Sequence, residues 1–280
     1  MNNHGLEQFL DGVHTLPSLS STVMELLSSL NQEDIDNAVL AGKIGRDPAL
    51  TARTLKLANS SFYGMSFKSK TLREAVSVLG SRTVRRLATS AAMIDTFSSD
   101  IRCGFDVRSL WQHAIAVALC AGELARSSHV NQDMAYVAGL LHDVGRLVLA
   151  TQRPADYARA MAYRAEHDCS VLHAERHQFG TDHASVGEAL IQHWRLPEEL
   201  RHAIANHHTV QESENQLLAL IVMAADAMAH ALDLVSDPNE AVPPVPMFVW
   251  QRLGQDDNTL RSVLTNVTQQ FSAASSLLDS

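Results

Sequence analysis

One stretch decides how this protein folds and where its chemistry lies: Leu141-His142-Asp143-Val144-Gly145-Arg146. It places adjacent His and Asp side chains in a strongly apolar segment, which we expect to be one helix from Asp133 to about Thr151. An ionised carboxylate in such surroundings costs on the order of several kcal/mol unless a cation or hydrogen-bond donors compensate it. A divalent metal ion does so directly, and imidazole with carboxylate suits zinc, iron, manganese or nickel better than calcium. The stretch therefore predicts metal ligands in a helical core.

The rest of the chain is also helical in pattern, with almost no strand-like alternation, and predicts an all-α fold. Apolar residues recur at three- and four-residue steps, as at Val23, Leu26, Leu27 and Leu30. Asp47-Pro48 is typical of a helix start, and residues 71–74 form a capping-box pattern. Further helices are expected at 107–127, from Pro154, after Asp182, from residues 196–199 to near His208, at 216–234 and from near Asp256.

A polar break at residues 98–106, which includes Gly104, divides the chain into two parts. We expect a smaller N-terminal helical subdomain at residues 1–97. Residues 98–280 would form a second helical domain that carries the His and Asp residues. Asp237-Pro238 and the prolines at 243, 244 and 246 predict a rigid linker before a C-terminal helical extension.

The composition and the charge of the chain limit the kinds of binding partner and the cellular compartment that we expect. The chain has 280 residues, a formal net charge of −9 and a pI of about 5.8, so no general affinity for nucleic acid or anionic lipid is expected. It contains no run of eighteen apolar residues and no signal-peptide pattern at its start, so neither a membrane span nor secretion is predicted. Three widely spaced cysteines predict no disulfide framework. We therefore expect a cytoplasmic protein.

Histidine is unusually abundant, with 14 residues, most of them between positions 113 and 230. Potential metal ligands recur on several predicted helices, each at a buried or end-of-helix position. They are numerous enough for two metal ions that share a bridging carboxylate. The candidate ligands are His113, His142, Asp143, His183, His207, His208 and Asp226.

Other polar residues are interpreted as ordinary. Glu175 is expected to be exposed, although a supporting role behind a ligand stays open. The basic run of Arg82, Arg85 and Arg86 is expected to be a solvated face, with a phosphate or an acidic partner as the alternative. The remaining histidines are taken as satisfied core or surface residues: His4, His14, His167, His173, His177, His193, His202 and His230.

Several separate motifs in the same order resemble the HDOD family (HD-related output domain) of bacterial signalling. The resemblance runs from about residue 10 to 235, and the HDOD family lies within the HD-domain metal-dependent phosphohydrolase superfamily. The matching motifs are Leu16-Pro17-Ser18-Leu19, Asp47-Pro48-Ala49-Leu50-Thr51, Leu57-Ala58-Asn59-Ser60, Tyr63-Gly64, Glu74-Ala75-Val76, Leu79-Gly80, Leu110-Trp111-Gln112-His113, Leu140 to Gly145, Phe179 to His183, and Trp194-Arg195-Leu196-Pro197.

The resemblance implies an HD-type helical bundle behind a smaller N-terminal helical subdomain, and a role in signal transduction. It also implies one or two divalent ions of iron, manganese, zinc or nickel. One ion would be held by His113, His142, Asp143 and Asp226, and the other by His183, His207 and His208. Asp143 and Arg146 would act in catalysis. The chain departs from the HD-GYP phosphodiesterases at Arg146, where their motif has Lys, and at Thr209-Val210, where Gly-Tyr-Pro is missing. These departures weaken the case for cyclic di-GMP hydrolysis.

Three functional interpretations stay open. The first is a metal-dependent phosphohydrolase that acts on a nucleotide or another phosphoester. The second is a catalytically silent regulatory module that binds a signalling protein through its N-terminal helices, roughly residues 10–97. The third and weakest is a di-iron oxygenase with the same ligands.

Overall fold

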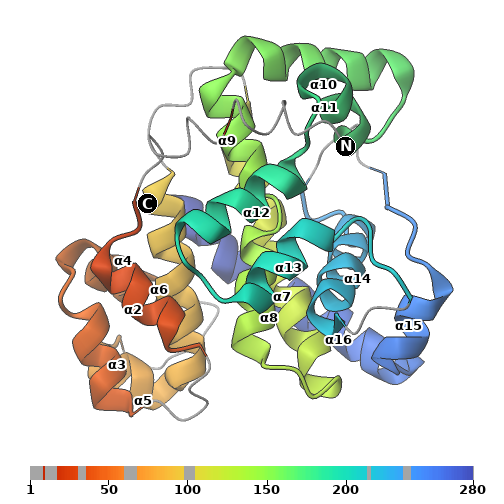
Figure 1. Cartoon of the computed structure of the whole chain (residues 1–280). Coiled ribbons are helices and arrows are strands. Elements are labelled where there is room, and N and C mark those ends of the chain that lie inside the picture. Colours follow the sequence, from red (N-terminus) through yellow and green to blue (C-terminus); the bar gives the residue numbers. More distant parts are fainter. Residues whose placement is uncertain are drawn as a thin grey trace.

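The structure is a computed structural model that describes residues 9, 18–30, 36–59, 68–97, 105–212, 216–235 and 241–279. Every regular element in these ranges is a helix, and they contain no strand (Figure 1). The all-α prediction is therefore confirmed. None of the described helices combines the length and the apolar character that a membrane span requires.

The N-terminal helices lie together at one end of the molecule, drawn red to yellow in Figure 1. Local capping sets where they begin. The Asp47 side chain accepts hydrogen bonds from the backbone N–H groups of Ala49 and Leu50, as predicted for a helix that starts at Pro48. Within the described residues, these helices are α2 (Ser21–Ser28), α3 (Asn37–Ile44), α4 (Pro48–Ala58), α5 (Leu72–Leu79) and α6 (Ser81–Thr96).

The central helices, together with the turns that follow α8 and α13, carry the candidate ligands. The long helix α7 packs against α8 and α14, while α12 packs against α9 and α13 (Figure 1). All residues of α8 after Gln132, and residues 219–229 of α14, are buried, so both helices lie in the core. The six helices are α7 (Val107–Ser127), α8 (Gln132–Leu141), α9 (Val144–Gln152), α12 (His183–His193), α13 (Glu198–Asn206) and α14 (Leu217–Ala231).

Two further pairs of helices flank this centre. A helical hairpin of α10 (Pro154–His167) and α11 (Val171–Phe179) follows α9 and turns at Asp168, which has a left-handed backbone. After residues 241–246, which have no regular structure, come α15 (Met247–Leu253) and α16 (Asp257–Ser275). Helix α16 packs along α7, and a 3₁₀ turn (Ser276–Asp279) then reaches the N-terminal helices.

The predicted single helix from Asp133 to Thr151 is wrong, because the structure has two helices with a turn at His142 and Asp143. The His142 ring hydrogen-bonds through Nδ1 to the carbonyl oxygen of Gly139 at 2.7 Å. That carbonyl is the acceptor that a continuous helix would offer to the backbone N–H of Asp143. The histidine side chain thus takes part in ending α8, and the turn directs the two side chains into the centre of the protein.

A glycine brings α9 and α12 unusually close together. A Cβ atom on Gly145 would lie 2.0 Å from the carbonyl oxygen of His183 and 2.8 Å from the backbone nitrogen of Gly187. The two helices therefore cross with backbone against backbone, which only a residue without a side chain permits. This crossing sets the distance between Asp143, just before α9, and His183, the first residue of α12.

The expectation that Arg82, Arg85 and Arg86 form a solvated face is wrong for Arg85. Its side chain is buried and forms an ion pair with the buried carboxylate of Asp133. Arg86 Nε lies 3.0 Å from the same carboxylate, and Arg85 also donates to the carbonyl oxygen of Ser29. The arginine run therefore joins the N-terminal helices α2 and α6 to the start of α8.

Some predictions fall outside the described residues. The domain boundary at 98–106 lies mostly within residues 98–104, so the division at residue 97 stays a prediction. The loop glycine Gly64, the linker residues Asp237-Pro238, and Cys103 are likewise not described.

Candidate metal centre

Two candidate ligands, His142 and His207, are fixed by the helix ends at which they lie. His142 follows α8 and His207 follows α13, and each hydrogen-bonds through Nδ1, at 2.7 Å, to the carbonyl oxygen three residues earlier. A carbonyl only accepts hydrogen bonds, so Nδ1 carries the proton in both rings. The Nε2 lone pair of each ring is therefore left to face the centre of the protein, in the tautomer that a metal ligand needs.

His183 is oriented by Glu175, and the expectation that Glu175 is exposed is wrong. The Glu175 side chain is fully buried. Its Oε2 atom accepts the backbone N–H of His183 at 2.8 Å and the ring Nδ1–H at 2.5 Å. One carboxylate thus caps the first turn of α12 and sets the tautomer of the ring, which leaves Nε2 pointing at the candidate centre.

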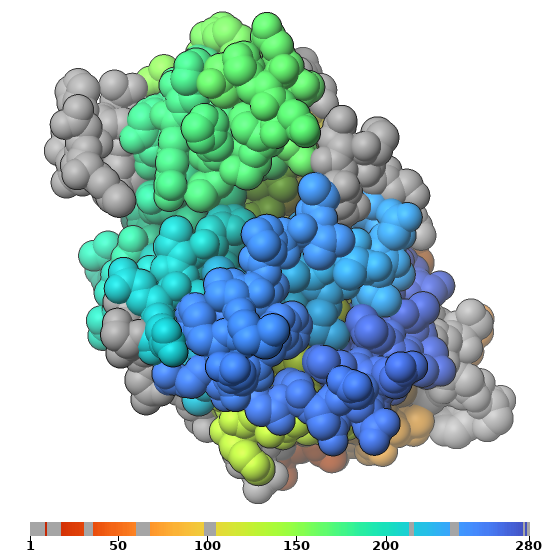
Figure 2. Space-filling view, turned by 90° about the vertical axis from the view of Figure 1, so that its right-hand side faces the viewer, coloured from red at the N-terminus to blue at the C-terminus, as the bar shows by residue number. Residues whose placement is uncertain are grey.

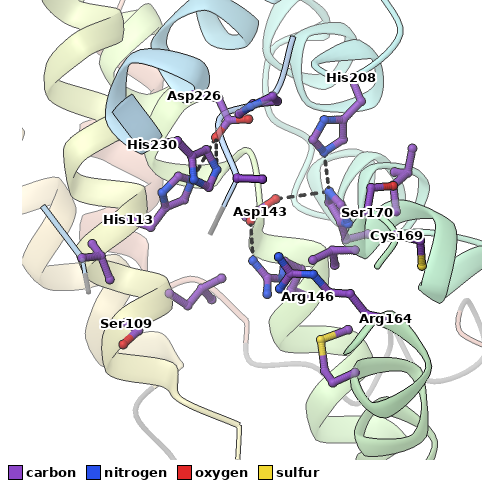
Figure 3. A pocket seen from close by; sticks show the side chains of 18 of the residues that line it. Ser109, His113, Asp143, Arg146, Arg164, Cys169, Ser170, His208, Asp226 and His230 are labelled. Carbon is purple, nitrogen blue, oxygen red and sulfur yellow. Dashed lines mark hydrogen bonds and ion pairs between the residues drawn. The ribbon is translucent and has the colours of Figure 1, made fainter. Parts of the chain in front are cut away.

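Asp143 lies in the middle of the cluster. Its Oδ1 atom is 3.2 Å from His183 Nε2, 3.7 Å from His142 Nε2 and 3.8 Å from His207 Nε2. Its other oxygen, Oδ2, accepts a hydrogen bond from Arg146 Nη1 at 3.0 Å (Figure 3). One oxygen therefore faces the imidazoles while the other is held by a guanidinium.

The other side of the cluster is built on Asp226, the only charged residue in the apolar helix α14. His113 Nε2 lies 2.9 Å from Asp226 Oδ1, and His142 Nε2 lies 3.8 Å from the same oxygen. His230, which was not among the predicted ligands, also lies here: its Nε2 is 3.3 Å from Asp226 Oδ1, and Figure 3 shows the rings of His113 and His230 beside that carboxylate.

Three overlapping groups of ligand atoms result. Within each group, the ligand atoms all lie within 4.8 Å of one another. Asp143 belongs to two of the groups and His113 to two. The groups are Asp143, His183, His207 and His208; His113, His142 and Asp143; and His113, Asp226 and His230.

The ring nitrogens of His183 and His208 meet directly, with their Nε2 atoms 2.9 Å apart. Burial acts to lower the pKa of His183, but the carboxylates of Glu175 and Asp143 outweigh it and raise that pKa to about 9. Burial, together with its histidine neighbours, holds the pKa of His208 well below its usual value. His183 therefore carries a proton on both ring nitrogens and donates from Nε2 to His208, and a metal ion that binds at this Nε2 would release that proton.

The carboxylates of the cluster are ionised, and the buried imidazole of His142 is neutral. Burial acts to raise the pKa values of Asp143 and Asp226, but neighbouring histidines, and Arg146 beside Asp143, hold both well below the usual value. Burial lowers the pKa of His142 to about 4. Ionised carboxylates and neutral imidazoles are the protonation states in which these groups bind a metal ion.

The Nε2 atom of His207 is placed as a metal ligand would be. The Nε2 atom of His207 is buried and has no hydrogen-bond partner among the described residues. A buried polar atom left unpaired costs about 1–3 kcal/mol, so such atoms are rare unless a water or an ion is bound there. Because Nδ1 of this ring already carries the proton, the unpaired Nε2 presents a lone pair, which suits a cation.

The cluster lies at the bottom of a pocket of about 1100 Å³. Figure 2 shows a hollow on this side of the molecule between the green surface of α10 and α11 and the blue surface beyond α14. Met161 and Leu172 of the helical hairpin and Val245 of residues 241–246 contribute apolar lining, and Arg146 and Arg164 contribute positive charge. The pocket therefore combines a cluster of histidines and ionised aspartates with two arginine side chains nearby.

All seven predicted ligands lie in the cluster, which places side chains from five parts of the chain around Asp143 and Asp226. Two further residues of the cluster, His230 and Glu175, were not predicted as ligands, and each had a signal in the sequence. His230 stands four residues after Asp226, on the same face of a helix. Glu175 stands between Val171 and Phe179 at four-residue steps, on the apolar face of α11.

Known proteins share both the sequence pattern and the architecture. The profile of the HDOD domain family matches residues 16–210. The solved structure of an HDOD domain protein of unknown function from Geobacter sulfurreducens has a TM-score of 0.80 and 25% identity, over 97% of this chain and 99% of that one. The structure of a candidate phosphohydrolase from Shewanella amazonensis has a TM-score of 0.77 and 27% identity, over 96% and 97% of the two chains.

A curated relative extends the same comparison. An uncharacterised protein of Treponema pallidum is 26% identical over 268 residues, which cover 94% of this chain and 51% of the relative. The chain thus spans about half the length of this relative.

Proposed function

The chain belongs to the HDOD domain family, and from this premise we propose that it is a signalling protein whose His/Asp cluster holds two metal ions and hydrolyses a phosphoester. The observation that carries the proposal is the position of Asp143, which is shared by two of the three groups of ligand atoms. A carboxylate shared in this way is the usual bridge of a two-metal site.

The proposed ligands follow from the geometry. One ion would be held by Asp143, His183, His207 and His208, and the other by His113, His142, Asp143 and Asp226. The rings of His142, His183 and His207 are held by hydrogen bonds at Nδ1, so they need little rearrangement to bind through Nε2. Bound divalent ions supply Lewis acidity, which activates water at neutral pH and offsets the negative charge of a phosphate.

The chain itself supplies the groups that orient a phosphate. Arg146 is held in place by Asp143 Oδ2 and by the hydroxyl of Tyr157, to which its Nε donates at 3.1 Å. These two contacts leave part of the guanidinium facing the pocket, where its planar set of N–H donors matches phosphate oxygens. Replacement of the Lys of related motifs by Arg146 therefore keeps a phosphate-binding cation at this position.

The shape of the pocket favours a substrate with an organic part. Its volume of about 1100 Å³ exceeds the space that inorganic phosphate needs and suits a nucleotide or a similar phosphoester. The apolar side chains of Met161, Leu172 and Val245 would contact the organic part, while Arg164 adds a second cation beside Arg146 (Figure 3). The name of the Shewanella amazonensis neighbour, a candidate phosphohydrolase, supports the same reaction class.

The proposal is tested by metal content and turnover together. Purified protein, Asp143→Ala and the control Asp257→Ala would be analysed by inductively coupled plasma mass spectrometry and assayed with bis(p-nitrophenyl) phosphate. Asp257 is an exposed residue of α16 outside the pocket and carries the same charge. We expect two transition-metal ions per chain and hydrolysis in wild type and control, and the loss of both in Asp143→Ala.

The other outcomes identify the alternatives. Bound metal without turnover of any phosphoester would contradict hydrolysis and favour a silent regulatory module. Iron that reacts with oxygen would favour the di-iron oxygenase. No bound metal, even after reconstitution, would refute the metal centre itself.

A further inference from the structure

The third group of ligand atoms shares His113 and Asp226 with one ion of the proposed pair, but its third member, His230, is a ligand of neither ion. His230 lies on α14, one turn after Asp226, and its Nε2 is 3.3 Å from Asp226 Oδ1. His113 Nε2 lies 2.9 Å from the same oxygen, and the centroids of the two rings are 4.5 Å apart. Two imidazole nitrogens thus converge on one ionised carboxylate, in the same way that His183 meets Asp143 on the other side of the cluster.

This group differs from the group of His113, His142 and Asp143 in its access to the pocket. The side chain of His230 is 23% exposed, whereas those of His142 and His207 are at most 1% exposed. His230, His113 and Asp226 all line the pocket, and His142 does not. An ion that enters from the pocket therefore meets the His113, Asp226 and His230 group before it reaches His142.

His113 cannot serve both positions at once. It belongs to the outer group with Asp226 and His230 and to the inner group with His142 and Asp143. An imidazole nitrogen has one lone pair, so His113 Nε2 can bind one ion at a time. The outer and the inner position are therefore alternative places for the same ion, which share His113 and are separated by the exchange of one or two ligands.

We propose that His113, Asp226 and His230 form a loading position, where a divalent transition-metal ion binds first and from which it moves inward by exchanging His230 for His142. This inference rests on the proposed metal centre. The outer position offers three protein ligands and an open side toward the pocket, through which an ion can enter or leave, whereas the inner position adds the buried ligands His142 and Asp143. His230 is thus a ligand of the entering ion and not of the ion at rest.

The test measures metal uptake separately from metal content. Metal-free full-length protein would be mixed rapidly with Co²⁺, and the rise of visible absorbance followed in wild type, His230→Ala, His230→Gln and the control His202→Ala. His202 is a histidine of α13 that belongs to none of the three ligand groups, and its side chain is 42% exposed. His230→Gln removes the imidazole but keeps a side chain of similar size. It therefore still tests the loss of the metal ligand if the alanine variant folds poorly. Circular dichroism checks the fold of each variant.

We expect both His230 variants to take up Co²⁺ about tenfold more slowly than wild type, the scale on which the loss of one supporting group changes a metal site. Their final content would stay at two ions per chain, and His202→Ala would match wild type. Equal uptake rates in His230→Gln and wild type would overturn the loading role. A lower final content in the His230 variants would also overturn it, because His230 would then be a ligand of the ion at rest. If the wild type binds no Co²⁺ at all, the metal centre of the proposed function is refuted, and the loading position falls with it.

Discussion

Replacement of Gly145 by alanine tests the link between helix packing and the metal centre. The added methyl group would lie 2.0 Å from the carbonyl oxygen of His183 and 2.8 Å from the backbone nitrogen of Gly187. A carbon–oxygen contact needs about 3.3 Å, so α9 and α12 must separate by roughly 1.3 Å. The obstacles are backbone atoms, which no side-chain rotation can move away.

The magnitude follows from two opposing effects. Overpacking of a close contact costs typically about 1–3 kcal/mol, and a clash with backbone belongs at the upper end of that range. Alanine is the better helix former by about 1 kcal/mol, which offsets part of the cost. We therefore expect Gly145→Ala to lower the free energy of unfolding by about 2 kcal/mol.

The same displacement reaches the site. Asp143 precedes α9 and His183 begins α12, and their Oδ1 and Nε2 atoms lie 3.2 Å apart. Metal–ligand distances tolerate changes of only about 0.2 Å, so a separation of the two helices by more than an ångström should abolish tight binding of the ion that both residues are proposed to hold. The protein would remain folded but lose metal.

The assay is urea denaturation of the metal-free protein, with metal content measured separately. Gly42→Ala is the matched control, because a Cβ at Gly42 in α3 meets no atom within 4 Å. We expect this control to be more stable than wild type by up to about 1 kcal/mol. The reasoning is refuted if Gly145→Ala is as stable as wild type or gains stability like the control.

Three further predictions concern buried polar groups. Glu175→Gln removes the carboxylate that orients His183 and should weaken metal binding about 10- to 100-fold in a competition titration with a chromogenic chelator. Asp133→Ala leaves the buried Arg85 without its carboxylate and should destabilise the protein by about 3–5 kcal/mol in urea denaturation. Cys120 should not react with a chromogenic disulfide reagent at mildly alkaline pH, because burial raises the pKa of its thiol to about 12.

Each of these predictions has an outcome that would contradict it. Wild-type metal affinity in Glu175→Gln would mean that the tautomer of His183 is set by something else. A loss of less than 1 kcal/mol, the scale of an exposed ion pair, in Asp133→Ala would mean that Arg85 is solvated without it. For Cys120, Cys120→Ser should leave the number of reactive thiols in the native protein unchanged and lower it by one in denaturant. A lower number in the native protein would show that the thiol is accessible.

Most of the helix limits could be predicted from the sequence, because the groups that set them lie within a few residues of one another. Asp47 caps the helix that begins at Pro48, and Asp182 caps α12 by accepting the backbone N–H of Ser185. Gly180 ends α11 with a left-handed backbone. Such capping hydrogen bonds are local, so they act in the same way whatever the rest of the chain does.

The break between α8 and α9 shows where local patterns fail. The apolar pattern continues through His142 and Asp143, so periodicity predicts one helix. The turn depends on the His142 ring hydrogen-bonding to the carbonyl oxygen of Gly139 and on the close crossing of Gly145 with α12. The second contact is made with α12, which lies outside the segment, so no pattern within the segment predicts it.

By itself, the sequence determined which side chains carry the chemistry, because an ionised Asp226 in an apolar helix and the His142-Asp143 pair demand compensation wherever they are buried. Only the tertiary structure decided how they are grouped. His113 and Asp226 are 113 residues apart in the chain, yet they meet at 2.9 Å because α7 packs against α14. The same packing brought His230 into the cluster and buried Glu175 behind His183. Contacts of this kind depend on how helix faces fit together across the core, which is a property of the whole chain and not of any one segment.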